Sequence, residues 1–359
     1  MAATNKVLIL GALGLVGRAL LNRLDSDPDW TVFAVSRRSP DFASSARWIA
    51  LDLTDHEACA RTFAGVEFAD VTHVVYAALF EQPALVRGWS DPEQIAVNAA
   101  MLRNVLDPLD IRADLRHVTV LQGTKAYGVH LGFTALPGKE SQPRPPGPNF
   151  YWAQEDYLRQ KQAGRGWHYA IFRPQIVFGV AIGSPMNVVA AVGAYAALQR
   201  EQGLPLQFPG SLFVSEATDA DLLARAIVWA GTTPHAADQT FNVTNGDVLV
   251  WQSLWPAIAR IFSMPVGEAR PATLATTMPA LGGMWEQIRA RQQLRYPLDE
   301  LVGSSWQFLD AVFAPHRTPV PTLVSTIKIR QFGFHDCVDT EAMLTSCLRR
   351  LQAMKILPV

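Results

Sequence analysis

The chain has 359 residues, a formal net charge of −1 and 49% hydrophobic residues. This length allows a large core, and the near-neutral charge argues against nucleic acid or an anionic membrane as the main partner. No apolar stretch reaches the roughly 20 residues that span a bilayer, and residues 1–6 lack the features of a signal peptide. Three cysteines and eight histidines without metal-ligand spacing predict a reducing compartment, the cytoplasm, and no metal site.

The first half of the chain alternates strand and helix patterns. Short apolar runs predict strands at residues 6–10, 31–35, 49–51, 71–76, 115–123 and 168–179. Helical periodicity predicts helices at 16–24, at 91–109, just before residue 168, and after residue 51, where Asp52 or Thr54 could be the cap. This alternation predicts an α/β protein with a Rossmann, doubly wound parallel sheet.

After Gly183 the alternation weakens and helical patterns dominate, at 186–203, 218–231 and through most of 251–359. A Pro- and Gly-rich loop is expected at 137–148, and a strand followed by a helix at 240–255. We predict a Rossmann domain at 1–183, to which 205–246 partly return. A smaller, mainly helical substrate lobe is expected from 184–204 and 247–359, over the carboxyl edge of the sheet.

A glycine-rich motif with Gly11, Gly14 and Gly17 joins the first strand to the first helix. Glycines let backbone amides approach a pyrophosphate, which the N-terminus of the helix then stabilises. The strand–turn–helix context is the one that a dinucleotide site requires, although a plain tight turn could also use these glycines. Leu15 and Val16, at the start of the helix, are expected to contact the cofactor as well.

The end of the second strand selects between the two nicotinamide cofactors. An acidic residue there would bond the ribose 2′-hydroxyl of NAD, but this chain has Ser36, Arg37 and Arg38, and no carboxylate until Asp41. Two guanidinium groups suit a 2′-phosphate, so we expect NADP(H). The alternative is a solvated basic loop.

Two further segments complete the expected adenine and ribose contacts. In the sequence LDLTD, Asp52 and Leu53 are placed to meet the adenine edge, although Asp52 could equally cap a helix. Ala77 and Ala78 follow the fourth strand, where small side chains would permit close approach of the nicotinamide ribose. They could equally belong to the core.

The sequence RPQIVFG, at 173–179, resembles a stretch of extended short-chain dehydrogenases. Backbone groups around Pro174 and Ile176 would face the nicotinamide amide.

Two tyrosines compete for the catalytic position of such enzymes. Tyr151 lies at about the expected distance before Arg173, but four residues later stands Glu155 instead of Lys. Tyr157 does have Lys161 four residues later, but it would lie deeper in the helix and be rotated by roughly 240° from Tyr151. We therefore interpret Tyr157 and Lys161 as a chance match, with Lys161 in solvent.

The serine or threonine of the usual catalytic set is also missing. It normally lies four residues before a Tyr-Gly pair, here Tyr127 and Gly128, and that position is Gly123, which we expect to border the cofactor. Lys125 follows two residues later. We predict that Lys125 and Tyr151 replace the usual set, although a single Lys after a strand is usually solvated and a single Tyr is usually core or surface.

At this point the sequence resembles the progesterone 5β-reductase/iridoid synthase-like family of short-chain dehydrogenases. The matching segments, between residue 7 and about residue 250, are GALGLVG, SRR, LDLTD, DVTHVVYAA, LQGTKAYG, NFYWAQED, HYAIFRPQIVFG, TDADLLA and FNVTNGD, and KILPV resembles the family's C-terminus. The resemblance implies NADPH-dependent 1,4-reduction of an α,β-unsaturated carbonyl compound, an enone. It places the catalytic Lys on Lys125 and the catalytic Tyr on Tyr151.

The chain departs from the family in places that line its substrate pocket. Leu79 stands where the family has an aromatic residue, and Ala126, Tyr127 and Gly128 stand where it often has His-Tyr-Met. The substrate therefore need not be a steroid. The expected lining residues are Leu79, Tyr127, Met186 and Phe208, with Trp89 as a further candidate.

The expected chemistry is hydride addition to the β-carbon of an enone, with Tyr151 donating to the enolate oxygen. A nearby Lys125 ammonium would lower the pKa of Tyr151 and hold the cofactor ribose. The alternatives are carbonyl reduction, sugar-nucleotide epimerisation or dehydration, and a non-catalytic NADP-sensing regulator. The expected partner is a small-molecule enone, and the oligomeric state is open, with a homodimer as one alternative.

Overall fold

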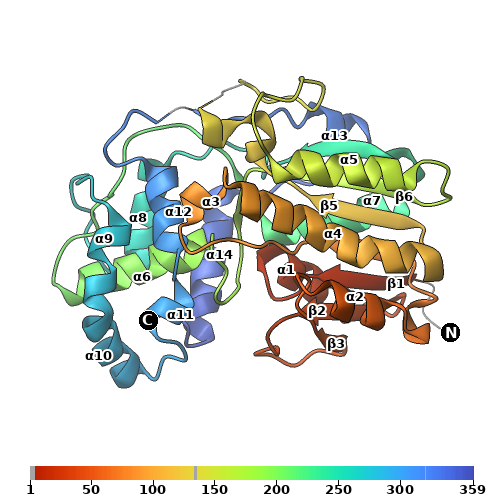
Figure 1. Cartoon of the computed structure of the whole chain (residues 1–359). Helices are drawn as coiled ribbons and strands as arrows, with labels where there is room; N and C mark the ends of the chain where they lie inside the picture. The colour runs from red at the N-terminus through yellow and green to blue at the C-terminus, as the bar shows by residue number, and fades with distance from the viewer. Residues whose placement is uncertain (1–4, 133–135, 320) are drawn as a thin grey trace.

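A computed structural model describes residues 5–132, 136–319 and 321–359 of the chain. Within these residues, seven parallel strands form one sheet in the order β3-β2-β1-β4-β5-β6-β9 (Figure 1). Their bounds are Asn5–Leu10 (β1), Trp30–Ser36 (β2), Arg47–Ala50 (β3), His73–Tyr76 (β4), His117–Leu121 (β5), His168–Pro174 (β6) and Gln239–Val243 (β9). The strand order reverses at β1, which pairs with both β2 and β4. This is the Rossmann arrangement that the sequence predicts.

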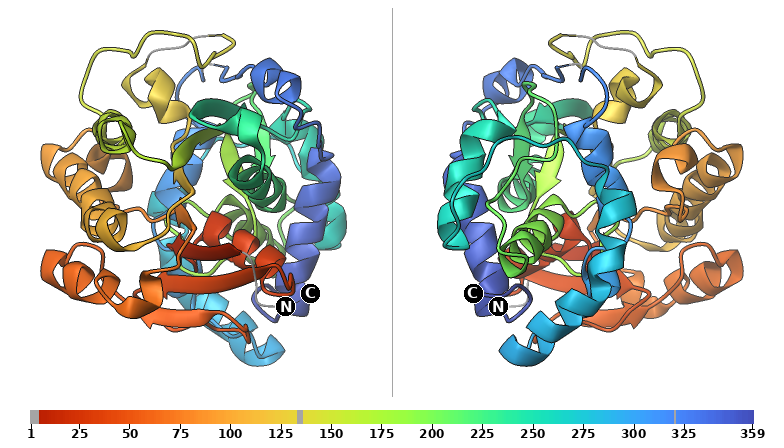
Figure 2. Two further views of the ribbon diagram at one scale, coloured as in Figure 1. Left: turned by 90° about the vertical axis from the view of Figure 1, so that its right-hand side faces the viewer. Right: turned by 90° about the vertical axis from the view of Figure 1, so that its left-hand side faces the viewer.

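Helices cover both faces of the sheet, and the central strands therefore bury consecutive residues rather than alternating ones. In β1, the four residues from Val7 to Leu10 are all buried. One face packs against α1 (Leu15–Leu24) and α7 (Ala220–Thr232). The other packs against α2 (His56–Phe63), α4 (Pro92–Arg112) and α5 (Phe150–Gln162). Figure 2 shows these last three helices together on one side of the strands.

The cap of α2 differs from the prediction. Asp55, and neither Asp52 nor Thr54, precedes the helix, and its side chain accepts a hydrogen bond from the amide of Ala58. The Asp52 carboxylate instead accepts hydrogen bonds from the amide and hydroxyl of Thr54 in a local turn.

The strand predicted at 168–179 divides in two. β6 ends at Pro174, and β7 (Ile176–Phe178) pairs with β8 (Ala217–Asp219) in a separate small sheet. Proline has no amide hydrogen to continue the ladder, so the chain can leave the sheet at this point. This departure carries the chain across the carboxyl end of the sheet and into the lobe.

The second part of the chain builds a mainly helical lobe beyond the carboxyl ends of the strands (Figure 1). Its helices are α6 (Val188–Glu201), α8 (Trp251–Ile261), α9 (Leu274–Thr277), α10 (Gly282–Gln292), α11 (Leu298–Leu301), α12 (Ser305–Phe313) and α14 (Thr340–Ala353). Segments cross between the two parts, because α7 and β9 return to the sheet and α13 (Ile327–Gln331) packs on it through Ile329. The domain boundaries given above therefore stay a prediction. None of the described helices is both long and apolar enough to cross a membrane.

The core of the lobe is a cluster of aromatic rings around Phe313, which is 1% exposed. Its ring centroid lies 5.0 Å from that of Trp251 and 5.1 Å from that of Phe208, in edge-on contacts. We expect Phe313→Ala to cost about 3–5 kcal/mol of unfolding free energy, because the cavity cannot collapse fully. Urea unfolding followed by tryptophan fluorescence measures this, with Leu212→Ala, at a side chain 71% exposed, as the control. Equal losses in the two variants would contradict the assignment of this cluster as the core.

Candidate active site

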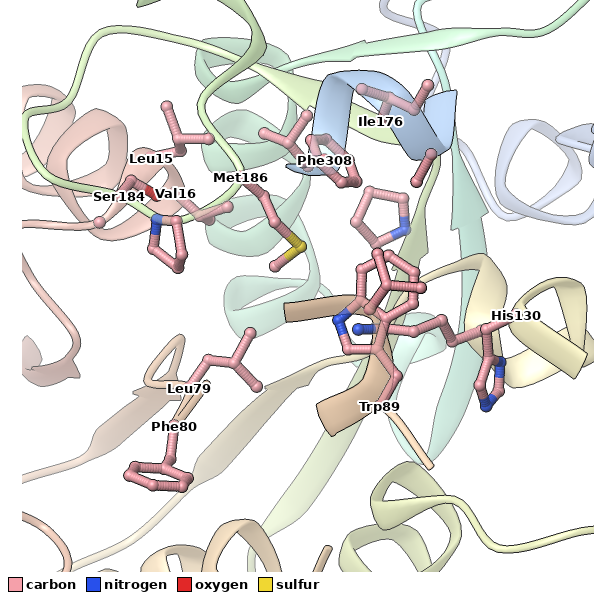
Figure 3. Close-up of a pocket in the computed structure, with 18 of the residues that line it drawn as sticks. Leu15, Val16, Leu79, Phe80, Trp89, His130, Ile176, Ser184, Met186 and Phe308 are labelled. Carbon is pink, nitrogen blue, oxygen red and sulfur yellow. The ribbon is translucent and has the colours of Figure 1, made fainter. Parts of the chain in front are cut away.

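A cavity of about 1080 Å³ lies between the carboxyl ends of the strands and the lobe. This volume is at the upper end of ordinary ligand sites, roughly 300–1,000 Å³, which suits a large cofactor together with a small substrate. Residues that follow β1, β2, β4, β5 and β6 line one part of it. Figure 3 shows side chains from both parts of the molecule around the cavity, among them Leu79, Trp89, Met186 and Phe308.

The glycine-rich turn lies at the floor of this cavity. Gly11 has a φ of +81°, and a Cβ there would lie 2.7 Å from the carbonyl oxygen of Ala77. Gly14 precedes α1 without a side-chain cap within the described residues, so the first amides of the helix are available to an anion. Gly14, Leu15 and Val16 line the cavity, as predicted. Gly17 does not, because it lies behind the turn, where a Cβ would overlap the Gly11 carbonyl.

The residues after β2 form a basic edge of the cavity, made by Ser36, Arg37 and Arg38. Both arginines are exposed, and Arg38 Nη2 donates a 2.8 Å hydrogen bond to the carbonyl of Ile182. The next carboxylate, Asp41, accepts a 2.9 Å bond from Arg18, which is 5% exposed. Asp41 is therefore paired with Arg18 of α1 and does not neutralise the positive charge of Arg37 and Arg38.

The remaining predicted cofactor residues all border the cavity, namely Asp52, Leu53, Ala77, Ala78, Gly123, Pro174 and Ile176. The small residues after β4 and β5 leave open the space above these strand ends. The donors of the glycine-rich turn, the basic edge and this open space fit an extended dinucleotide that crosses the sheet at its switch point.

Tyr151 is held at the start of α5 by Asn149, the residue before the helix. The Asn149 side chain accepts a hydrogen bond from the Tyr151 amide at 3.0 Å and donates one to the Lys125 carbonyl at 2.8 Å. The Asn149 side chain therefore connects the segment that carries Lys125 to the segment that carries Tyr151. The Tyr151 hydroxyl lies 3.4 Å from the position of a Cβ on Gly123, which is where the usual serine or threonine would begin.

Tyr157 and Lys161 lie elsewhere, on the side of α5 that contacts α4. The Tyr157 hydroxyl and the Lys161 ammonium each donate a 2.8 Å hydrogen bond to Asp107. They line a separate depression, not the main cavity. Lys161 is 20% exposed and ion-paired, so the prediction that it is simply solvated was wrong.

Lys125 lies on a 3₁₀ turn, η2 (Thr124–Tyr127), and its ammonium lies among the aromatic rings of Trp89 and Tyr151. Lys125 Nζ is 4.4 Å from the ring centroid of Trp89 and 5.9 Å from that of Tyr151. The nearest carboxylate oxygen, Glu81 Oε1, is 3.7 Å away, beyond hydrogen-bonding distance. Within the described residues Nζ is buried and has no hydrogen-bond partner, although Lys125 borders the cavity.

The electrostatics around these groups differ from the prediction. Burial lowers the pKa of Lys125, and the charge of Glu81 opposes this shift. Burial raises the pKa of Tyr151, and Glu81 adds to the increase. The expected lowering of the Tyr151 pKa by Lys125 is therefore wrong for the protein without ligands, because desolvation and the Glu81 carboxylate dominate.

Glu155, which stands where the usual Lys would be, is part of a buried network with Arg173. Glu155 Oε2 lies 3.2 Å from Arg173 Nη2 and accepts a 3.1 Å hydrogen bond from Gln122. Arg173 Nε donates to Gln122 Oε1 at 2.8 Å. Although burial alone would raise the pKa of Glu155, these partners lower it, so the carboxylate is ionised. The network supports the first turns of α5 and the end of β6 from behind the site.

Of the residues that the sequence predicts to line a substrate pocket, only some border this cavity. Leu79, Trp89 and Met186 line it. Tyr127 does not, because it is buried and its hydroxyl donates a 2.6 Å bond to Asn242. Phe208 does not either, because it packs into the aromatic core of the lobe. Lining residues that the sequence did not indicate include Phe80, Val86, His130, Phe213, Gln307 and Phe308.

Comparisons with known proteins agree with this fold. Residues 7–244 match the profile of the NAD dependent epimerase/dehydratase family. A (S)-8-oxocitronellyl enol synthase from Camptotheca acuminata is 32% identical, over 98% of this chain and 93% of the relative. A 3-oxo-Delta(4,5)-steroid 5-beta-reductase from Arabidopsis thaliana is 32% identical, over 98% and 92%.

Among solved structures, a UDP-glucose 4-epimerase from Thermotoga maritima aligns with a TM-score of 0.68 at 16% identity, over 97% of this chain and 99% of that chain. The protein RMD from Pseudomonas aeruginosa, complexed with NADPH, aligns with a TM-score of 0.66 at 15% identity, over 98% of each chain. At these identities the likeness concerns the fold.

The fold, the glycine-rich turn and the matched profile define an oxidoreductase of the extended short-chain dehydrogenase class, with a nicotinamide dinucleotide as its class of cofactor. Within that class, the near full-length relatives at 32% identity are an enol synthase and a steroid 5-beta-reductase. The chain belongs to the progesterone 5β-reductase/iridoid synthase-like family.

The Glu155–Arg173 pair yields a stability prediction. Glu155→Lys would restore the spacing of the usual Tyr-x-x-x-Lys motif, but it would bury a second cation beside Arg173. We expect a loss of about 3–5 kcal/mol in unfolding free energy, or loss of folded protein. Urea unfolding measures it, with Glu93→Lys on the exposed first turn of α4 as the control. A Glu155→Lys variant as stable as the wild type would contradict the role of the network.

Proposed function

We propose that the protein reduces the C=C bond of α,β-unsaturated carbonyl compounds with NADPH, by 1,4-addition of hydride. The observation that carries this proposal is the pairing of a buried Lys125 ammonium, free of hydrogen-bond partners among the described residues, with Tyr151 across from Gly123. The named activities of the two relatives, an enol synthase and a 3-oxo-Δ(4,5)-steroid reductase, support the same chemistry.

The bound dinucleotide supplies the hydride, and the residues of the chain orient the substrate and receive the charge that develops on it. When the β-carbon of an enone accepts hydride, negative charge collects on the carbonyl oxygen. Tyr151 donates a hydrogen bond to that oxygen, and because burial raises its pKa, it remains a donor and does not act as a base. Lys125 adds positive charge from the side of Trp89. Water can then protonate the enolate.

Two other functions were open at the level of the sequence. Carbonyl reduction or epimerisation of a sugar nucleotide suits the wider family, but the position of the usual serine is Gly123 and that of the usual Lys is Glu155, which is bound to Arg173. A non-catalytic NADP sensor would need the glycine-rich turn and the arginines but not Lys125 and Tyr151. Following NADPH absorbance with enones, ketones and UDP-sugars separates the three.

The cytoplasmic location and the homodimer also stay predictions.

The catalytic tyrosine is tested with two matched variants. We expect Tyr151→Phe to lower kcat for small enones by about 100- to 1,000-fold, the usual loss for one donor to a developing oxyanion. Tyr157→Phe, on the same helix and paired with Asp107, should retain wild-type turnover. NADPH binding, followed by fluorescence, should persist in both. The opposite pattern of losses would overturn the assignment.

Arg37 and Arg38 are proposed to bind the 2′-phosphate of NADPH. Each charge-assisted hydrogen bond contributes about 1.5–3 kcal/mol, so either single change to Ala should weaken NADPH binding by about 10- to 100-fold. NADH binding should change little, because NADH lacks this phosphate. Fluorescence titration of both cofactors gives the ratio, and Arg47→Ala, at an exposed arginine of β3, is the control. Equal losses for NADPH and NADH would contradict 2′-phosphate recognition.

A further inference from the structure

A buried carboxylate, Glu81, lies beside Lys125 without itself lining the cavity, and it has no role in the chemistry described so far. Its side chain is 3% exposed and lies on the segment between β4 and α3 (Leu85–Gly88). Glu81 Oε2 accepts a 2.6 Å hydrogen bond from Gln94 Nε2. Gln94 is itself fully buried, and its Oε1 accepts a hydrogen bond from the amide of Gln82. These bonds hold the carboxylate in one orientation.

The other oxygen of Glu81 faces Lys125. Oε1 lies 3.7 Å from Lys125 Nζ and has no hydrogen-bond partner in the part of the chain that the structure describes. A buried carboxylate without a counter-charge is strongly unfavourable, and so is a buried ammonium. Each of these two groups therefore compensates the charge of the other, although at 3.7 Å they do not form a direct hydrogen bond.

The segment that carries Glu81 also carries Trp89, whose ring lies over Lys125. A helix of the lobe anchors this segment, because Gln307 of α12 accepts a hydrogen bond from the Leu85 amide and donates one to the Pro83 carbonyl, each at 3.0 Å. Figure 3 shows Trp89 and, on α12, Phe308 at the same cavity. The position of Glu81 is thus linked to the lobe that borders the substrate.

We propose that Glu81 is a positioning residue of the reductase, which holds the Lys125 ammonium beside Trp89 and keeps both Lys125 and Tyr151 in their hydrogen-bond-donating forms. The inference rests on the proposed function, since it assigns Glu81 a part in the same reaction. Glu81 does not touch the reacting atoms; it acts through the two donors.

The charge of Glu81 acts on both donors in the same sense. It favours the ammonium of Lys125 and disfavours ionisation of Tyr151, while burial raises the pKa of Glu81 itself and the charge of Lys125 opposes that shift. The third titratable group facing Lys125 is His130, on the turn that follows η2, and burial together with Lys125 lowers its pKa to about 4. His130 is therefore neutral near pH 7 and does not replace the charge of Glu81. The other neighbours of Nζ, Trp89 and Phe150, are aromatic rings without charge.

Removal of the Glu81 charge should make both donors lose their protons at lower pH. A charge within about 4–6 Å shifts a pKa by about 1–3 units, so Glu81→Gln should move the alkaline limb of the kcat/KM profile down by about that amount. Glu81→Asp keeps the charge one methylene further back and should restore most of the wild-type profile. The control is Glu93→Gln, at an exposed carboxylate on the neighbouring turn of α4, which should leave the profile unchanged.

A second measurement reports on Lys125 without turnover. The rate at which an acylating reagent modifies Lys125 in the cofactor-free protein, followed by mass spectrometry across pH, gives the midpoint at which the amine loses its proton. This midpoint should fall in Glu81→Gln and largely recover in Glu81→Asp. If Glu81→Gln does not fold, Glu81→Asp alone should still give a smaller downward shift in both measurements.

The outcomes separate the two proposals. Wild-type turnover of enones with unshifted profiles and labelling midpoints in the Glu81 variants would overturn the role of Glu81. A shifted labelling midpoint in a protein that turns over no enone would support the coupling of Glu81 to Lys125 and overturn the proposed function instead.

Discussion

The proposed active site depends on one buried positive charge, the ammonium of Lys125. It lies among aromatic rings where water is scarce, so its charge acts on a ligand more strongly than it would in solvent. The same burial would favour loss of the proton if no carboxylate were near, and Glu81 Oε1 lies 3.7 Å from Nζ. The arrangement around this charge determines where Tyr151, Trp89 and the segment after β4 can lie.

The residues that replace the usual serine and lysine of short-chain dehydrogenases contact one another or lie close together, so they form an alternative site. Gly123 leaves space beside the Tyr151 hydroxyl, and Lys125, two residues further along, brings the positive charge from a different element. Asn149 couples the two segments through one side-chain amide. Glu155 occupies the place of the usual Lys and turns to Arg173, behind the site. A donor without a neighbouring base suits the stabilisation of an enolate better than proton transfer to and from an alcohol.

The sheet carries features that this enzyme shares with many dinucleotide-binding proteins, whereas the lobe carries features that differ from one such protein to another. The strand ends provide the glycine-rich turn, the arginine edge and the small residues after β4, as many dinucleotide-binding folds do. Residues of the lobe and of α3 close the other side of the cavity with apolar and aromatic side chains. We therefore expect substrate choice to depend on the contacts between these two parts, where Gln307 connects α12 to the segment that carries Trp89.

The sequence by itself determined the sheet class, the glycine-rich turn and the basic edge, because these depend on local periodicity and on residue types at short spacings. It also singled out Lys125 and Tyr151, whose catalytic roles stay a prediction. Only the tertiary structure decided that Asp55 caps α2, that β6 ends at Pro174, and that Tyr127 and Phe208 lie away from the cavity. It alone brought Glu81 to Lys125 and reversed the expected shift of the Tyr151 pKa. The physical reason is that burial and long-range charge pairs arise from residues far apart in the chain, and no local pattern in the sequence records how they meet.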